Sequence, residues 1–335
     1  MVNAPLLLPG EPGLIGHSLA KGRIGAVLLG FVLLFLAMLG ATPARAVGED
    51  AIAVIYPDIG EPYREVFEKI IEGAEKKIGA RVTNYPVRFD TDVSVLNANL
   101  ARQNTKVVIA LGRQGMKAAW ALSSNFGVVV GGVLTVPENE VRGYSVISLT
   151  PDPALLFARM KALKPAVRRV YVVYDPGFNG WLMKLARDSA RAQGLELVAR
   201  EAQDTRSAVR SYQEIFSVAD SRTDALWLPQ DSITVEESTI LPLVLQESWK
   251  LGFAVFSSNA AHVRRGVLFS LYPDNMALGR SLAGLAQGML SSGDYAGHGM
   301  MPLRDVQSAI NLRTAKHLGL GAEPHPGFDT IFPEQ

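Results

Sequence analysis

The sequence predicts an α/β protein with two doubly wound parallel-sheet lobes joined by hinge crossovers. Short apolar runs rich in β-branched residues alternate with stretches whose apolar residues recur at the period of a helix, and this alternation occurs in two successive series. Strands that alternate with helices form parallel sheets, so two series predict two lobes. The length of 335 residues also exceeds what one hydrophobic core usually supports.

The composition excludes several classes of function. Hydrophobic residues make up 48% and charged residues 19% of the chain, which is typical of a folded protein. The formal net charge of +1 offers no basic surface for nucleic acid, so we expect no nucleic-acid partner. The chain has no cysteine, which excludes disulfides, thiolate metal ligands, cysteine nucleophiles and a lipidated N-terminal cysteine.

The N-terminal segment has the pattern of a secretory signal. Lys21 and Arg23 precede an apolar run over residues 24–39, and the sequence Ala-Arg-Ala at 44–46 supplies the small residues of a cleavage site. We therefore expect residues 1–46 to be a cleavable signal peptide and the mature chain to be periplasmic. The apolar run approaches the length of a membrane span, so an uncleaved N-terminal anchor is the alternative.

The two series of strands and helices follow this segment. The first contains the expected strands 51–56, 82–89, 106–111 and 127–134, with helices between them. The second contains the expected strands 170–174, 195–200, 225–228 and 253–256. Residues 142–151 lie between the two series and are the candidate hinge. The segment 291–299 is rich in Gly and Ser and is expected to be a loop.

Four segments carry a family resemblance by their order over about residues 50–320. They are RRVYVVYDPG, DALWLPQDSITV, FAVFSSNAAHVRRGVLFSLYPDNMALGRSLAGLAQGML and AINLRTAKHLGL. In this order they are similar to the ABC-transporter substrate-binding family that includes bacterial aromatic-amino-acid-binding proteins. The resemblance implies a type I periplasmic-binding-protein fold with three crossovers between the lobes.

The resemblance also implies how the chain is divided. Lobe 1 is expected to comprise residues 47–146 plus 264–292, and lobe 2 residues 147–263 plus 293–320, with a loose tail rich in Pro and Gly over 321–335. The segment 267–290 is accordingly expected to return to the first lobe, and a strand at 309–312 is expected to rejoin the second.

Candidate ligand-binding residues follow from the geometry of parallel sheets. The carboxyl ends of the strands and the amino ends of the helices face one crevice, where ligands collect and where helix N–H groups attract carboxylates. The candidates at the expected strand ends are Asp58, Tyr63, Gly112, Arg113, Gln114, Thr135, Tyr174, Phe178, Asp231, Ser232, Asn259 and Tyr272. The aromatic residues among them, together with Tyr56, would make an aromatic-lined cleft.

Three of these candidates have a structural alternative. Gly112 also suits a tight strand-to-helix turn, and Asp231 suits a helix cap as well as the ammonium group of a ligand. Asn259 likewise has two interpretations, contact with a ligand and hydrogen bonding within its own loop. In the family that the chain resembles, a small hydroxyl residue usually follows the glycine, whereas Arg113 stands here, so the ligand type stays open.

Catalytic motifs are absent from the sequence. It has no Gly-x-Ser-x-Gly elbow, no phosphate-binding Gly-x-x-x-x-Gly-Lys loop and no dinucleotide-binding Gly-x-Gly-x-x-Gly turn. The scattered histidines are expected in solvated positions, the adjacent Glu236 and Glu237 on a solvated helix face, and the basic segment 262–265 facing water or a partner. We therefore expect a non-enzymatic protein with no cofactor and no metal.

The predicted function is capture of a small ligand, an amino acid or other small carboxylate, in a cleft between two lobes that close around it. The resemblance implies an exported, monomeric solute-binding protein that delivers its ligand to an ABC permease in the inner membrane. The alternative is a periplasmic receptor domain that signals to a sensor kinase without transport, because both functions use the same ligand, cleft and closure.

Overall fold

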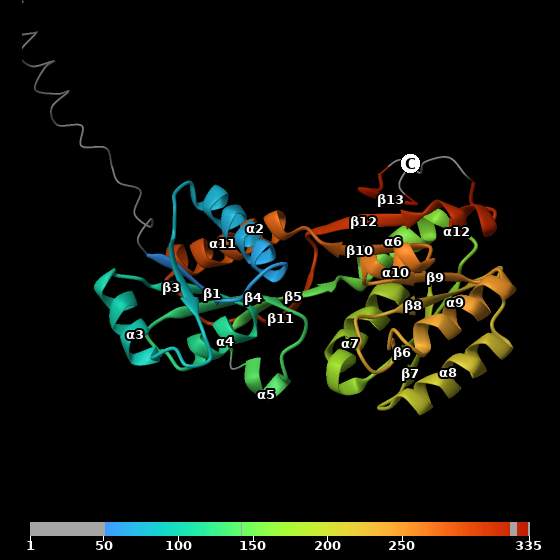
Figure 1. Cartoon of the computed structure of the whole chain (residues 1–335), viewed down its shortest axis with the longest axis horizontal. Helices are drawn as coiled ribbons and strands as arrows, with labels where there is room; N and C mark the ends of the chain where they lie inside the picture. The colour runs from blue at the N-terminus through green and yellow to red at the C-terminus, as the bar shows by residue number, and fades with distance from the viewer. Residues whose placement is uncertain (1–50, 142, 322–326, 334–335) are drawn as a thin grey trace, which may run out of the picture. The chain divides into compact units, whose positions relative to one another are not determined.

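The computed structural model describes residues 51–141, 143–321 and 327–333 (Figure 1). The predicted signal peptide lies outside the described residues. The described chain forms two mostly parallel sheets, each with helices on both faces, which confirms the predicted fold class. Within these residues no helix combines the length and the hydropathy that a membrane span requires.

The first sheet is entirely parallel and has the strand order β11-β5-β4-β3-β1-β2. Its strands are β1 (Ile52–Pro57), β2 (Thr83–Val87), β3 (Val107–Leu111), β4 (Gly127–Val133), β5 (Ser145–Pro151) and β11 (Gly299–Leu303). The helices of this lobe are α2 (Tyr63–Ile78), α3 (Val93–Arg102), α4 (Gly112–Trp120), the short α5 (Glu138–Val141) and α11 (Asn275–Ser292). Alternate residues of a strand point to opposite faces, so Val54 packs with α2 and α11 while Ala53 packs with α3.

Helices α2 and α11 pack together with their backbones in close approach. A Cβ atom on Gly279 would lie 1.9 Å from the carbonyl oxygen of Ile70, and one on Gly73 would lie 2.1 Å from the carbonyl oxygen of Met276. Glycine therefore permits this helix pair, because any side chain at either position would overlap backbone atoms that cannot move independently.

The second sheet has the strand order β13-β12-β10-β9-β8-β6-β7. Its strands are β6 (Arg169–Tyr174), β7 (Glu196–Glu201), β8 (Asp224–Leu228), β9 (Ala254–Ser257), β10 (Phe269–Pro273), β12 (Val306–Asn311) and β13 (Thr330–Phe332). Only the β10–β12 pair is antiparallel. One face is covered by α6 (Pro153–Leu163), α7 (Pro176–Ala192) and α12 (Leu312–His317), and the other by α8 (Thr205–Val218) and α9 (Ile240–Leu251), while α10 (Ala260–Arg265) connects β9 to β10.

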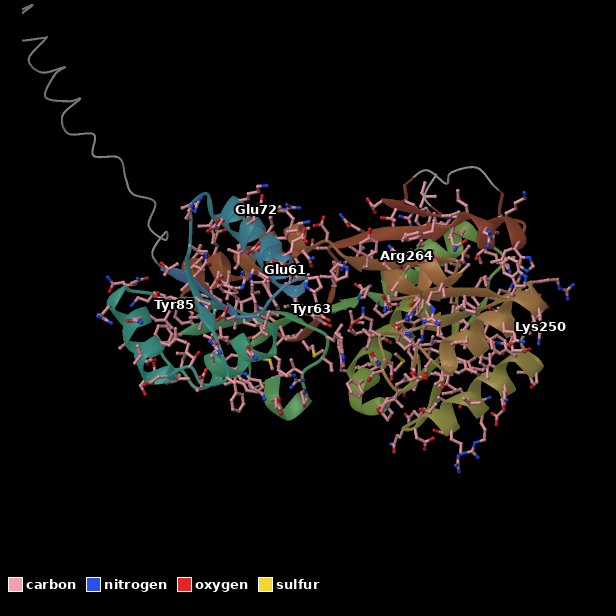
Figure 2. All side chains as sticks on the ribbon, viewed as in Figure 1. Glu61, Tyr63, Glu72, Tyr85, Lys250 and Arg264 are labelled. Carbon is pink, nitrogen blue, oxygen red and sulfur yellow. The ribbon has the colours of Figure 1, made fainter. Side chains whose placement is uncertain are left out.

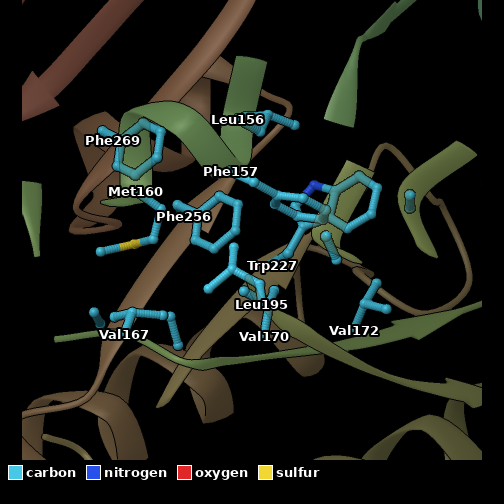
Figure 3. Close-up of a cluster of buried hydrophobic side chains, with 14 of the residues drawn as sticks. Leu156, Phe157, Met160, Val167, Val170, Val172, Leu195, Trp227, Phe256 and Phe269 are labelled. Atoms are coloured by element: carbon cyan, nitrogen blue, oxygen red, sulfur yellow. The ribbon is translucent and has the colours of Figure 1, made fainter. Parts of the chain in front are cut away.

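An aromatic core lies between the second sheet and helix α6 on one of its faces (Figure 3). The ring of Phe157 meets Trp227 edge to face at 5.6 Å between centroids, and Phe256 stacks on Phe269 at 5.2 Å. The indole N–H of Trp227 donates to the hydroxyl of Ser258 at 3.0 Å. This core therefore supports the loop at the carboxyl end of β9, where a ligand site is expected.

The crossovers between the lobes differ in three places from the expected division of the chain. Strand β11 lies in the first sheet, so residues 299–303 do not belong to the second lobe, although the expected range 293–320 placed them there. Strand β5 extends to Pro151 in the first sheet, so residues 147–151 do not belong to the second lobe. Strand β10 pairs with β9 and β12 in the second sheet, and only the following helix α11 packs on the first lobe. The return to the first lobe thus begins after Pro273 and not at residue 267. The expected strand at 309–312 is present as β12 and lies in the second sheet.

Two edge strands were not expected. Strand β11 pairs with β5 although it contains Pro302, and β13 pairs with β12 inside the segment expected to be a loose tail. Proline and glycine weaken the local strand pattern, but at a sheet edge one side of the strand needs no hydrogen-bonding partner. Pairing with a neighbour distant in sequence therefore decides these two strands.

Candidate functional site

A cavity of about 780 Å³ lies where strands of both sheets end. From the first lobe it is lined by Arg113, Gly132, Val133, Leu134, Thr135, Leu149 and Thr150. From the second lobe it is lined by Phe178, Asn179, Pro229, Gln230, Asp231, Ser232, Val235, Glu236, Glu237, Asn259 and His262. Its size and its position at the carboxyl ends of parallel strands are typical of a small-molecule site.

The cavity brings together half of the residues predicted from the sequence. These are Arg113, Thr135, Phe178, Asp231, Ser232 and Asn259. The other predicted residues, Asp58, Tyr63, Gly112, Gln114, Tyr174 and Tyr272, do not line it. In the first lobe the site therefore lies along β3, β4 and β5 and leaves out the loop that follows β1.

The expected aromatic lining does not form. Tyr63 is 66% exposed, and Tyr174 is buried in the core with its hydroxyl donating to Glu201 Oε1 at 2.8 Å. The hydroxyl of Tyr272 bonds with Thr330 Oγ1 at 2.9 Å, which joins β10 to β13. Of the aromatic residues considered, all of them described by the structure, Phe178 is the one that lines the cavity.

Gly112 makes the turn from β3 into α4. Its φ of +65° lies in the left-handed region, and a Cβ atom there would lie 3.0 Å from both Phe67 Cζ and Pro57 Cγ. Gly132, with φ of +69°, approaches the backbone nitrogen of Gly112, so the end of β4 lies against the start of α4. This geometry favours the turn-forming alternative for Gly112 and brings the cavity-lining end of β4 next to Arg113.

The first-lobe wall of the cavity is electropositive. Arg113 is about half exposed, and its Nη1 lies 3.9 Å from Glu140 Oε2, a long ion pair that forms no hydrogen bond. Helix α4 has Leu111 at its N-cap position, so no side chain caps its first N–H groups. The uncapped helix end adds partial positive charge beside the guanidinium.

The loop after β4 is held by hydroxyl groups of β5. The carbonyl oxygen of Leu134 accepts hydrogen bonds from Ser148 Oγ at 2.5 Å and Thr150 Oγ1 at 3.4 Å. The side chain of Leu134 is left 45% exposed, and it lines the cavity. An apolar surface on this wall is therefore held in place by buried polar groups beneath it.

Asp231 forms a buried clamp between two loops of the second lobe. Its Oδ2 accepts from the backbone N–H of Asp175 at 2.7 Å and from Asn179 Nδ2 at 3.1 Å. Its Oδ1 accepts from the backbone N–H groups of Ile233 and Thr234 at 3.0 and 2.9 Å. A carboxylate has about four acceptor positions, so internal donors occupy its capacity and the capping alternative is favoured.

A second polar network surrounds His262. This side chain is 3% exposed, which contradicts the expected solvated position. Its Nδ1 lies 2.8 Å from Ser257 Oγ and its Nε2 lies 3.4 Å from Asn259 Nδ2, while Asn259 Oδ1 caps α10 through the N–H of Ala261. Since Asn259 Nδ2 can only donate, Nδ1 is the protonated nitrogen of the neutral ring. Burial lowers the pKa of His262 to about 4, and the charge of Arg265 contributes to the same direction.

Glu236 and Glu237 line the cavity, and the Glu237 side chain is solvated as expected, but the two residues precede α9 and are not on a helix face. Backbone N–H groups of Ser238 and Thr239 each donate to the carboxylate of Glu236 at 2.7 Å, and the hydrogen bonds from these two residues lower its pKa to about 2. Glu237 Oε2 lies 3.6 Å from Arg265 Nη1. The second-lobe wall is thus electronegative. Both residues lie in the β8–α9 connection, a strand-end loop that could have marked them as candidates.

No group of three or more His, Asp or Glu side chains with the arrangement of a metal site occurs in the described ranges. Several polar side chains of the cavity, Asp231, Asn259 and Glu236 among them, are instead hydrogen-bonded to loop backbone. The arrangement suits reversible binding by charge and shape.

Comparison with known proteins identifies relatives by sequence model and by fold. Residues 90–323 match the family model described as ABC transporter substrate binding protein. No curated protein matches the chain. A conserved domain protein from Vibrio cholerae has 18% identity and a TM-score of 0.50, with 84% of this chain and 99% of that chain covered. The ligand-free, open structure of a substrate binding protein with adhesive properties from Clostridium difficile has 15% identity, the same coverages and a TM-score of 0.57.

Proposed function

We propose that this chain, which belongs to the ABC transporter substrate binding protein family, captures an amino acid with an apolar side chain and delivers it to an ABC permease. Membership of the family implies a small-molecule ligand and a permease partner. The proposal adds that the chain is not an enzyme, that it acts as a monomer, and that its N-terminal segment directs it to the periplasm.

The opposite charges on the two walls of the cavity are the observation that carries this ligand class. Arg113 and the uncapped amino end of α4 attract a carboxylate on the first-lobe wall. Glu236 and Glu237 attract an ammonium group on the second-lobe wall. A zwitterion that spans the cavity satisfies both walls, whereas a simple carboxylate leaves the acidic wall without a partner.

The apolar side chains of the cavity support an apolar ligand body. Phe178 is 41% exposed at the start of α7, and Leu134 is exposed on the opposite wall. Large apolar side chains that stay partly exposed within a cavity gain free energy when a ligand removes them from water. These two positions favour a branched or aromatic amino acid over a small polar one.

The position of these groups on separate lobes provides a reason for lobe closure. A ligand whose carboxylate binds one lobe and whose ammonium binds the other has more contacts when the lobes approach, so it stabilises the closed state. The loops that follow β6 and β8 are held by Asp231, and the loop that follows β4 is held by Ser148 and Thr150. Each wall can therefore move as one body.

A thermal-shift screen of the full chain tests the ligand class. Amino acids, small carboxylates, sugars and purines are compared, because binding to the native state alone raises the melting temperature. We expect the largest shifts with apolar amino acids. A strong response restricted to sugars would overturn the proposal.

Calorimetry with the best amino acid then tests the role of Arg113. Loss of a charge-assisted hydrogen bond should weaken binding at least about tenfold in Arg113→Gln. Arg102→Gln, an exposed substitution on α3 outside the cavity, is the matched control and should keep the wild-type affinity. Equal affinities in the two variants would contradict the proposed carboxylate contact.

Uptake of the same radiolabelled amino acid tests delivery. Deletion of the gene should abolish high-affinity uptake, and expression of the wild-type chain should restore it. Unchanged uptake with loss of a ligand-dependent transcriptional response would instead support the sensing alternative.

A further inference from the structure

We propose that the second lobe holds a binding site for a phosphate-bearing anion at the seam between α10 and α12, separate from the cavity described above. This site consists of Arg264 and Arg313 and the pocket that they line. It would bind an effector or a headgroup and not the transported ligand.

The pocket has a volume of about 490 Å³ and lies among α9, α10 and α12. Its lining includes Phe253 and Gly266, the residues near the amino ends of β9 and β10. The ligand cavity is reached from the carboxyl end of β9, through Asn259 and His262. The two sites are therefore at opposite ends of the same strand.

Two hydrogen bonds, one buried and one partly buried, join the segments that carry the arginines. Asn311 Nδ2 donates to the carbonyl oxygen of Val263 at 2.8 Å, and Thr314 Oγ1 donates to that of Gly266 at 2.8 Å. Arg264 lies between the two acceptor residues in sequence, and Arg313 lies between the two donor residues. The seam thus holds both arginines on adjoining backbone.

Basic residues often occur in the last turn of a helix because they interact with its unpaired carbonyl groups. Here other side chains already perform that role. Asn311 and Thr314 bond to carbonyl groups at the end of α10, and His317 Nε2 lies 2.8 Å from the carbonyl oxygen of Trp249 at the end of α9. The guanidinium groups of Arg264 and Arg313 are consequently not needed to satisfy these helix ends.

The pocket also has an excess of positive charge. Among the described residues, its lining includes Lys250, Arg264, Arg265 and Arg313 and no acidic residue. Lys250 pairs with Glu247 at 2.7 Å, and Arg265 pairs with Glu237.

Within the part of the chain that the structure describes, Arg264 and Arg313 have no acidic side chain at ion-pair distance. The guanidinium of Arg264 lies instead over the ring of Phe332 in β13, with its Cζ 5.4 Å from the ring centroid. Lys250, labelled with Arg264 in Figure 2, lines the same pocket, but its ammonium group is already paired with Glu247. The proposal therefore rests on the two arginines.

The chemistry of these residues indicates a phosphate group. Arginine presents planar N–H pairs that match the oxygens of phosphate, and two guanidinium groups without an acidic partner among the described residues match an anion of two or more charges. A compact phosphate group supplies that charge within a pocket of small-molecule size. Trp249 and His317, stacked at 3.8 Å, add a flat wall to the pocket.

Titration calorimetry of the full chain with pyrophosphate tests the site. We expect binding at low ionic strength that weakens as sodium chloride is added, because ions screen exposed charges. The double variant Arg264→Gln/Arg313→Gln should bind at least about tenfold more weakly. The control Arg191→Gln/Arg222→Gln removes two exposed arginines from the same lobe and should bind as the wild type does. Arg113→Gln should also leave pyrophosphate affinity unchanged, which separates this site from the ligand cavity.

Sedimentation with vesicles distinguishes the two sources of a phosphate group. The double variant Arg264→Gln/Arg313→Gln is called the seam variant. Loss of pyrophosphate binding in the seam variant, with no sedimentation of the wild type on phosphatidylglycerol vesicles, supports a free phosphate compound. Sedimentation on phosphatidylglycerol but not on phosphatidylcholine, lost in the same variant, supports a lipid headgroup. Pyrophosphate and vesicle binding that are both absent, or that are equal in the seam variant and its control, would overturn the proposal. Matching circular dichroism melts of the two double variants verify that folding does not cause the difference.

Discussion

Asp231 Oδ2 accepts a hydrogen bond from the backbone N–H of Asp175 at 2.7 Å, which ties the loop after β8 to the loop after β6. Asp175 in turn caps α7 by accepting from the N–H of Gly177 at 2.8 Å. Asp231 therefore fixes the backbone of Asp175, and Asp175 fixes the start of α7, where Phe178 lines the cavity. A loss of ligand binding in a variant of Asp231 would not by itself identify a ligand contact, because the wall depends on this residue.

Substitution Asp231→Ala should lower the free energy of unfolding by about 3 kcal/mol, since it leaves buried donors without an acceptor. Urea unfolding followed by circular dichroism measures the change. Asp188→Ala on the exposed face of α7, whose carboxylate pairs with Arg191 at 3.5 Å, should stay within about 0.5 kcal/mol of the wild type. Equal unfolding midpoints for the two variants would refute the clamp.

Protonation of His262 should make the fold less stable in mild acid. Its folded-state pKa of about 4 lies below the ordinary value of 6.5, so between these pH values the unfolded chain binds a proton that the folded chain does not. The free energy of unfolding should thus fall by about 2–3 kcal/mol as the pH decreases from 6.5 to 4.

Urea titrations at half-unit pH steps measure this dependence. His262→Gln should be less stable at neutral pH but should show a flatter profile in the window, because the titrating ring is gone. Glu237 and Arg265, the charged groups that act on His262, are present in both proteins and serve as an internal control. Parallel profiles for the two proteins would exclude His262 as the cause.

Two glycines of α11 should respond oppositely to alanine. A methyl group at Gly279 would lie 1.9 Å from the carbonyl oxygen of Ile70, so Gly279→Ala should cost about 3 kcal/mol or more of stability. Gly284 lies in the same helix with no atom within 4 Å of an added Cβ, so Gly284→Ala should stabilise by about 0.5–1 kcal/mol. Chemical unfolding of the two variants gives the comparison, and a stabilising Gly279→Ala would disprove the close helix contact.

Phe178 should contribute to ligand affinity more than to stability, because its ring is 41% exposed in the cavity. Phe178→Ala should weaken binding of an apolar amino acid about tenfold. Leu185→Ala, on the same helix with similar exposure but outside the cavity, provides the matched control. Calorimetry on the two variants should show the loss only for Phe178→Ala, and equal losses would argue against an apolar ligand body.

Local sequence patterns predicted the parallel strands well. The run Val107–Leu111 is buried along its whole length as β3, as expected for a strand covered by helices on both faces. Because such strands end at one edge of the sheet, the residues just after them were sound candidates, and Arg113, Thr135, Phe178, Asp231, Ser232 and Asn259 do line the cavity. Tyr63 and Asp58 also follow a strand, but the loop after β1 lies outside the cavity, and no local pattern indicates which loops a cavity includes.

The sequence by itself determined the two-series α/β fold, because strand and helix periods depend on each residue and its near neighbours. Tertiary structure alone decided that β11 pairs with β5, that β10 stays with the second sheet, and that Glu236 and Glu237 face the cavity. It also decided the burial of His262 and the exposure of the α10–α12 seam. These properties depend on which surfaces distant segments cover, and a polar side chain acquires its charge and function from those surroundings.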